Sequence, residues 1–455
     1  MDSIFVKSKR EKHIVLTLVL LSYLVTAIDG SIVITGLSCI MVDLHLNHEG
    51  LSWVQNAYLL SFGGFMLIGG RLGDTLGRKR LFNYSLLLFG IGSAVAGMAQ
   101  SVTAMIVARF IQGLGAAALA PTSLALIMDY FEGSERTKAV AWYGSISGLG
   151  LCVGLILGGA VTSYASWRDG FLVNIPVIMV MLSLSVKFLT DTKMIKRKFD
   201  IAGTMLSVCG IFCLLYSIDG AKNEVIWAII GTISLVLFII VEQKTIYPVM
   251  PLYLFYKGDR WRAYIARALL IGALMGYNFF ISEYMQDVFH FTPLMTGLAF
   301  LPMTFTTFIG AISVPPLVER HGNKRILTLG FLLLIIGFCG LLLLNKDSTY
   351  LKHIALSMLF IGWGQGLAMS PLTNLGIYGV NHADAGVASG LVNVAHQVGG
   401  AFGLSIMVAA SNGMVDMDLR FHIGMTVALC CIATALLISF VPVMRNSPHG
   451  IGQVH

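Results

Sequence analysis

The sequence predicts an all-α protein that crosses a membrane many times, and three observations lead to this fold class. Of the 455 residues, 56% are hydrophobic and only 12% are charged, whereas a soluble domain carries about 25% charged residues. The apolar residues form runs of about 20, which is the length of a membrane-spanning helix. The basic residues fall mainly in alternate connections between these runs, a pattern typical of polytopic membrane proteins.

Each apolar run is expected to form one membrane helix. The first run is too long for the core of a signal peptide and has no small-residue cleavage site after it, so we expect it to be retained. No connection is long enough for a separate soluble domain. The fourteen predicted helices cover residues 14–38, 52–71, 81–99, 103–127, 138–162, 170–190, 200–219, 225–243, 263–287, 295–317, 325–345, 351–376, 386–411 and 423–444.

The distribution of lysine and arginine predicts the orientation in the membrane. When the predicted helices alternate in direction, 24 of the 30 basic residues lie on the side of the N-terminus, five lie on the other side, and Arg109 lies inside a helix. This asymmetry predicts a multi-pass protein of the cell membrane with both termini in the cytoplasm. It also accounts for the net charge of +7, so no nucleic-acid partner is expected.

The spacing of reactive residues gives no indication of an enzyme. The seven cysteines have neither metal-ligand nor disulfide spacing, and no nucleophile triad is recognisable. We therefore expect no metal site, no cofactor and no catalytic residue.

An internal sequence repeat predicts two related halves. The string DTLGRKR at 74–80 follows the second predicted helix, and ERHGNKR at 319–325 follows the tenth, with the same spacing from acid to glycine. Two six-helix bundles, 1–190 and 263–455, would place both strings at corresponding positions. The segment 191–262 then contributes two inserted helices flanked by basic linkers.

Three strings resemble a known family. GRLGDTLGRKR at 70–80 is similar to the signature between helices 2 and 3 of the major facilitator superfamily. RFIQGLGAA at 109–117 resembles the helix 4 motif of its drug:proton antiporters, and IDGSIV at 28–33 resembles a motif of the fourteen-helix branch. One departure is Leu155, which stands where the glycine-rich fifth helix of that family has proline, so the bend there is expected to be softer.

The resemblance implies a monomeric transporter in the lipid bilayer that exports amphipathic, often cationic, drugs and dyes in exchange for protons by alternating access. Two alternatives stay open. One is an exporter with a narrow substrate, such as a lipid, an amino acid or an antibiotic. The other is a membrane sensor that has the fold but transports nothing.

Ionisable residues inside the predicted helices are candidates for proton coupling, since charges within a membrane are costly and mark pathways. Asp29 and Arg109 lie at a similar depth from the same side, so an acid coupled to a buried arginine is expected. The alternatives are a static ion pair and an Arg109 that simply donates hydrogen bonds to backbone carbonyls. Glu283, in the ninth predicted helix, is the second candidate acid, with an acid at the water boundary as the other interpretation.

Two further groups of residues complete the predicted site. Candidates for the substrate cavity, chosen by position, are Tyr58, Tyr143, Tyr277, Asn278, Trp363 and Gln397. Gating is expected at the repeated loop strings, where glycines permit tight turns and charges can meet helix ends. The gating candidates are Gly70, Asp74, Gly77, Arg78 and Glu319.

Overall fold

A computed structural model describes residues 9–190, 200–219, 222–245, 248–256, 260–345, 347–380, 384–414 and 416–440. Helices account for almost all of these residues, and no strand occurs among them. The helices are α1 Lys9–Asp43, α2 His48–Leu76, α3 Arg78–Gly97, α4 Val102–Tyr130, α5 Gly133–Tyr164, α6 Trp167–Leu172, α7 Asn174–Phe188, α8 Ile201–Ile218, α9 Glu224–Lys244, α10 Tyr253–Tyr256, α11 Arg260–Asp287, α12 Pro293–Ala299, α13 Leu301–His321, α14 Asn323–Leu341, the π-helical turn η1 Tyr350–Ala355, α15 Leu356–Ile377, α16 Ala385–Ala410 and α17 Met417–Phe440.

Helix lies over every one of the fourteen predicted segments, with α6 and α7 sharing one segment. In the described part of the chain, twelve helical spans are long and apolar enough to cross a membrane. The helices α3 and α5 are not among these twelve, and α3 carries three basic residues in its first turn. The number of fourteen crossings therefore stays a prediction.

Some predicted boundaries are wrong by several residues. The helix expected to begin at 423 begins at Met417, which places Arg420 inside α17. The first helix begins at Lys9 rather than at 14 and ends at Asp43 rather than at 38. Hydropathy locates the apolar centre of a span, whereas the backbone continues as helix into the polar ends.

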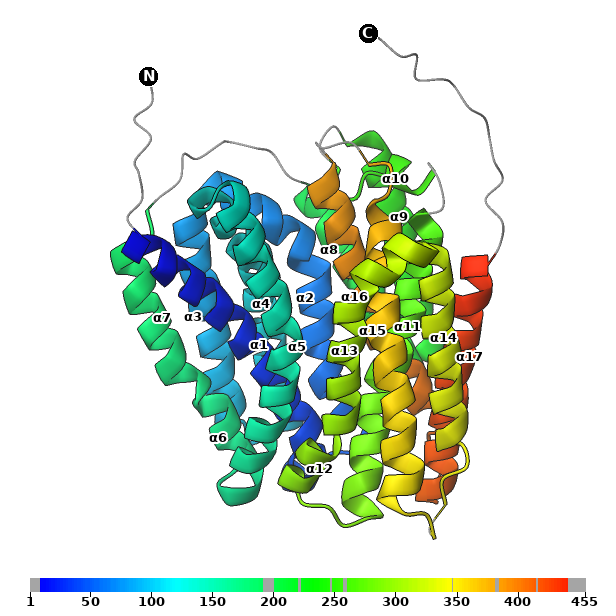
Figure 1. Cartoon of the computed structure of the whole chain (residues 1–455). Helices are drawn as coiled ribbons and strands as arrows, with labels where there is room; N and C mark the ends of the chain where they lie inside the picture. The colour runs from blue at the N-terminus through cyan, green and yellow to red at the C-terminus, as the bar shows by residue number, and fades with distance from the viewer. Residues whose placement is uncertain are drawn as a thin grey trace, which may run out of the picture.

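The helices form two groups that stand side by side (Figure 1). The group α1 to α7 lies on the left of the view and the group α11 to α17 on the right, with α12 reaching under the first group. The first group is held by contacts such as α2 with α4, and the second by the corresponding α13 with α15. Between the groups, α2 contacts α16, α1 contacts α11, and α5 contacts α12.

The first described residue of α1 and the last of α17 lie towards the same side of the molecule, the top of Figure 1. We call this side the terminal face and the opposite side the distal face. At the terminal face, Lys12 Nζ lies 2.7 Å from Glu135 Oε2 and ties the start of α1 to the start of α5. At the distal face, Trp167 Nε1 donates to Asp43 Oδ2 at 3.1 Å and ties α6 to the end of α1.

The internal sequence repeat is accompanied by a repeated backbone turn. Gly77 separates α2 from α3 with φ 91° and ψ 136°, and Gly322 separates α13 from α14 with φ 81° and ψ 155°. These positive φ values favour glycine because a side chain rarely adopts them. The corresponding loops of the two groups therefore turn in the same way.

The pair α8 and α9 packs against both groups. The two helices contact each other, and α8 also contacts α2 and α16. On the α2 side, the ring of Trp53 lies 5.4 Å from Phe212 and 6.0 Å from Tyr216. The inserted helices therefore cover the seam between the two groups on one flank of the molecule.

Candidate functional site

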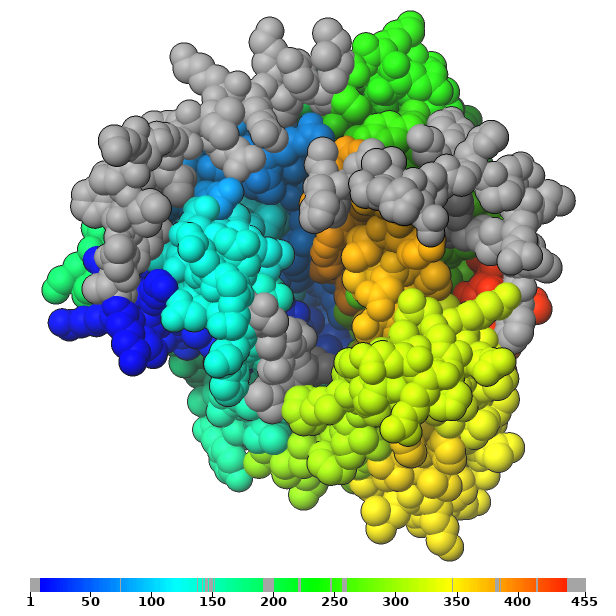
Figure 2. All heavy atoms as spheres, turned by 45° about the horizontal axis from the view of Figure 1, so that its top comes forward, coloured from blue at the N-terminus to red at the C-terminus, as the bar shows by residue number. Residues whose placement is uncertain are grey.

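A cavity of about 1910 Å³ lies between the two groups of helices. Its walls come from α1, α2 and α4 on one side and from α11, α13, α15 and α16 on the other, and its rim includes Met128, Pro251 and Asp384 at the terminal face. Figure 2, which brings this face forward, shows a hollow between the blue and cyan atoms of the first group and the orange and yellow-green atoms of the second. The cavity thus opens at the terminal face.

The distal end of the cavity is closed by polar contacts between α1 and α11. Ser282 Oγ donates to the carbonyl oxygen of Ile34 at 2.6 Å, and Gln286 Nε2 donates to the carbonyl oxygen of Thr35 at 3.1 Å. A second link joins α2 to α16, where Asn56 Nδ2 donates to Ser405 Oγ at 2.8 Å. All of these side chains are buried, so the two groups are sealed on this side.

Asp29 and Arg109 meet inside the first group, as their depth predicts. Arg109 Nη1 donates to Asp29 Oδ2 at 2.5 Å, and the two residues are only 1% and 0% exposed. The other carboxylate oxygen accepts from Gln112 Nε2 at 2.7 Å and from Asn174 Nδ2 at 3.1 Å. A buried carboxylate with this many donors is held in a fixed position.

Arg109 connects this network to the cavity. Its Nε donates to the carbonyl oxygen of Val54 at 3.1 Å, and its guanidinium lies 4.4 Å from the centre of the Tyr58 ring. Arg109 and Tyr58 line the cavity, whereas Asp29 does not. A molecule in the cavity can therefore act on the carboxylate through the arginine.

Glu283, the second candidate acid, is also buried and paired. Its Oε1 accepts from Arg420 Nη1 at 2.7 Å and lies 2.8 Å from His48 Nδ1. His48 begins α2 in the first group, while Glu283 and Arg420 belong to α11 and α17 in the second. The cluster lies at the distal seal, outside the cavity lining.

The structure divides the predicted substrate residues into two sets. Tyr58, Tyr143 and Gln397 line the cavity. Tyr277, Asn278 and Trp363 do not. Tyr277 is fully buried against Phe338 within the second group, with ring centres 5.7 Å apart, and Trp363 is 47% exposed.

Among the predicted gating residues, Arg78 has the most contacts. It forms an ion pair with Asp129 and donates to the carbonyl oxygen of Ala125 at 2.9 Å, which ties α3 to the end of α4. Gly70 and Arg78 line the cavity near its mouth. Glu319 is exposed in the last turn of α13. The side chain of Asp74 lies outside the part of the structure that is described.

Sequence reasoning left three functional side chains of this site unassigned. Gln112 lies within the string RFIQGLGAA and Asn174 near the start of the sixth predicted helix, yet their bonds to Asp29 needed the packing of α1, α4 and α7. Arg267 was counted among the basic residues on the side of the N-terminus although its predicted helix begins at 263, and the structure places it two turns inside α11 on the cavity wall. An arginine so close to an apolar run was the available signal.

In the described part of the chain, no group of three or more histidine, cysteine, aspartate or glutamate side chains could hold a metal ion.

Comparisons with known proteins agree on one family. The family model of the Major Facilitator Superfamily matches residues 19–404. The puromycin resistance protein pur8 of Streptomyces alboniger is 33% identical over 421 residues, which cover 90% of this chain and 83% of that protein. The cephamycin export protein CmcT of Amycolatopsis lactamdurans is 31% identical over 459 residues, which cover 96% and 94%.

Solved structures show the same fold at low sequence identity. The inward-open, partially occluded structure of the xylose transporter XylE from E. coli has a TM-score of 0.67 at 14% identity, and the match covers 97% of this chain and 100% of that chain. The peptide-transporter-family structure of PepTSo has a TM-score of 0.69 at 14% identity, with 95% and 98% covered.

Proposed function

Because the chain belongs to the major facilitator superfamily of membrane transporters, we propose that it exports amphipathic drugs or antibiotics in exchange for protons. It is a multi-pass membrane protein and not an enzyme, and its relatives include proteins of antibiotic resistance and export. The single observation that supports proton exchange most is the buried pair Asp29 and Arg109, since the arginine also lines the cavity.

Alternating access follows from the two ends of the cavity. In this state the cavity opens at the terminal face, while the contacts of Ser282 and Gln286 close the distal face. Transport requires a second state, in which these contacts break and the terminal ends of the groups approach each other. We propose that the terminal face is cytoplasmic, that the chain crosses the cell membrane fourteen times, and that it works as a monomer.

Proton exchange requires an acid whose proton affinity depends on the substrate. In the present state Asp29 accepts hydrogen bonds from Arg109, Gln112 and Asn174. A substrate that favours this paired form expels the proton towards the cytoplasm, and by linkage a proton that binds Asp29 from outside favours release of the substrate. The expectation that substrates are often cations stays a prediction.

A narrow substrate range is the second candidate function. It is favoured by the names of the relatives, since one is a puromycin resistance protein and another exports cephamycin. An exporter of this kind needs the same cavity and the same coupling residues, so only the range of substrates separates the two proposals.

Efflux from loaded cells tests the proposed function. Cells that express the protein and are loaded with ethidium should lose the dye faster than cells without it, and a protonophore should stop this difference. No efflux of ethidium, together with efflux of a single antibiotic such as puromycin, would favour the narrow exporter. No flux of any tested compound would contradict export altogether.

A further inference from the structure

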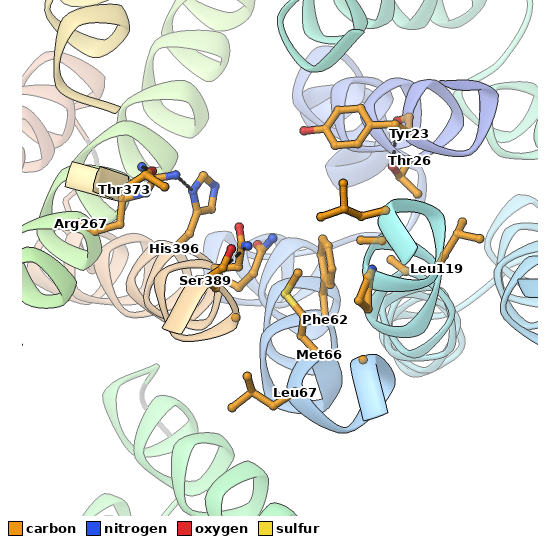
Figure 3. A pocket seen from close by; sticks show the side chains of 18 of the residues that line it. Tyr23, Thr26, Phe62, Met66, Leu67, Leu119, Arg267, Thr373, Ser389 and His396 are labelled. Carbon is orange, nitrogen blue, oxygen red and sulfur yellow. Dashed lines mark hydrogen bonds between the residues drawn. The ribbon is translucent and has the colours of Figure 1, made fainter. Parts of the chain in front are cut away.

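We propose that Arg267 binds a carboxylate or similar oxyanion carried by the substrate, so that the cavity selects amphipathic molecules with a negatively charged group. This inference rests on the proposed function, because it names the chemistry of the molecule that the cavity takes up, and it replaces the expectation of cationic substrates with an anionic group. Figure 3 shows Arg267 with Thr373 and His396 on one wall of the cavity, while Tyr23 and Thr26 lie on the other.

Both Nη groups of Arg267 contact neighbouring helices, whereas its Nε group does not. Its Nη1 donates to the carbonyl oxygen of Met369 at 2.9 Å and to Thr373 Oγ1 at 3.2 Å, both on α15. Its Nη2 lies 3.3 Å from His396 Nδ1 on α16. These three contacts leave two of the five N–H groups of an arginine, and the Nε group has no hydrogen-bond partner in the described structure.

Arg267 also lacks a counter-charge. No carboxylate lies within 4.0 Å of its nitrogens among the described residues, although the side chain is only 8% exposed. The nearest titratable side chain in contact is His396. Since a guanidinium has only donors, Nδ1 of the imidazole must face it as an acceptor, and a neutral ring does not cancel the charge.

Two of the three other arginines that line the cavity provide a direct comparison, and the third, Arg71, lies near the mouth and donates to the carbonyl oxygen of Pro248. Arg109 is paired with Asp29, and Arg78 is paired with Asp129. The described lining contains one acid, Asp384, and this residue lies at the mouth, beside Tyr253. The middle of the cavity therefore offers a buried positive charge with no protein carboxylate to match it.

A purely structural role does not account for this arrangement. A link from α11 to α15 needs only the Nη1 group, and a neutral side chain such as glutamine could provide it without the cost of a buried charge. An arginine presents a planar fork that fits a carboxylate, which explains why this residue type is suited to an oxyanion site. Phe62, Met66 and Phe308 line the cavity and can contact the apolar body of such a molecule.

Binding to the purified full-length protein in zwitterionic detergent tests the proposal without any need for transport. The probes are dansyl-undecanoate, which carries a carboxylate, and its methyl ester, which has the same apolar body without the charge. The parent protein should bind the carboxylate about tenfold more tightly than the ester, the difference expected for a charged hydrogen-bonded pair.

Three variants distinguish the effect of the planar guanidinium of Arg267 from the effect of the positive charge of the protein. Arg267→Gln should lose about tenfold in affinity for dansyl-undecanoate and less than about twofold for the ester. Arg267→Lys keeps the charge but not the fork, so it should lose less than the glutamine variant. Arg320→Gln is the matched control, because it removes one positive charge from an exposed residue outside the cavity lining.

Equal binding of the two probes by the parent protein would overturn the proposal, even if Arg267→Gln does not fold. An equal loss for both probes in Arg267→Gln would also overturn it, because it would indicate a structural role alone. The binding and efflux experiments distinguish a failure of the oxyanion site from a failure of the proposed export function. A protein that prefers the carboxylate but exports nothing contradicts export, and an exporter that binds both probes equally contradicts the oxyanion site.

Discussion

His48 of α2 lies 2.8 Å from Glu283 of α11, and this contact joins the two groups of helices at the distal face. The glutamate is 2% exposed and also accepts from Arg420 Nη1 at 2.7 Å. A carboxylate between two basic side chains from different groups stabilises the closed distal seal. The contact must break whenever the distal face opens.

We therefore predict that Glu283→Gln shifts the protein towards the state that is open at the distal face. The substitution keeps the shape but leaves Arg420 buried without its carboxylate, which weakens the sealed state. Spin labels at the exposed positions Val42 and Met414 report the separation of the two groups. The variant should show a larger fraction of long distances than the parent.

The control for this measurement is Glu132→Gln, which removes an exposed acid at the opposite face. Its distance distribution should match that of the parent protein. If Glu283→Gln also matches the parent, the cluster of His48, Glu283 and Arg420 does not hold the distal seal.

The membrane topology gives a second prediction. Single reporter cysteines at Asn223 and Asp347, in a variant without the seven native cysteines, should react with an impermeant thiol reagent added to intact cells. A cysteine at Glu319 should react only after the cells are opened. Labelling at Asp347 but not at Asn223 would contradict the crossing by α8 and α9. Labelling of the cysteine at Glu319 in intact cells would contradict cytoplasmic termini.

Close packing of α11 on α16 gives a third prediction. A Cβ atom on Gly403 would lie 2.2 Å from the Cα atom of Gly272, so Gly403→Ala requires the two backbones to move apart. Overpacking of this kind costs about 1–3 kcal/mol, and we expect a lower apparent melting temperature. Gly386→Ala, in the same helix but with nothing within 4 Å, should leave stability unchanged or raise it slightly. Equal melting temperatures of the parent, Gly403→Ala and Gly386→Ala proteins would show that the contact between the backbones of α11 and α16 is not tight.

The carboxyl group of Asp219 gives a prediction on pH. Asp219 follows α8 at the distal end, and its burial, with a smaller contribution from the charge of Glu49, raises its pKa to about 7, although the nearby hydroxyl of Ser405 favours the charged form. In the unfolded chain an aspartate has a pKa of about 3.9. The folded protein therefore binds the proton more tightly, and the stability that this contributes is lost as the pH rises from the unfolded towards the folded pKa.

Between about pH 5 and about pH 7 this loss amounts to about 2–3 kcal/mol at most, from about 1.4 kcal/mol for each pH unit. The apparent melting temperature of Asp219→Asn should therefore depend less on pH over this range than that of the parent. Asp347→Asn, an exposed acid at the same face, is the control. A parallel pH dependence in all three proteins would exclude Asp219 as the titrating group.

The sequence predicts those parts of the site that depend on position along a helix or on a repeated string. Asp29 and Arg109 could be matched because each lies at a countable depth from the same membrane side. Gly77 and Gly322 could be matched because their flanking residues repeat. Both predictions need only the order of helices and the rise of 1.5 Å per residue.

Other features depend on how helices are rotated, which the sequence does not resolve here. Tyr277 and Arg267 lie on α11, where most side chains are buried on every side, so no apolar stripe distinguishes the cavity face from the core. The contact of His48 with Glu283 depends on how the two groups lean together at one face. Hydropathy also placed Arg267 and Arg420 outside or at the edge of the apolar runs, which concealed their burial.

Proton release on addition of substrate tests the central claim, that Asp29 couples export to protons. Purified parent protein in weakly buffered detergent solution should release protons when a transported drug is added, because the drug favours the carboxylate paired with Arg109. Asp29→Asn should bind the drug and release no protons, whereas Glu283→Gln should still release them. Proton release from Asp29→Asn equal to that of the parent, at several pH values, would contradict the claim and make Glu283 the leading candidate.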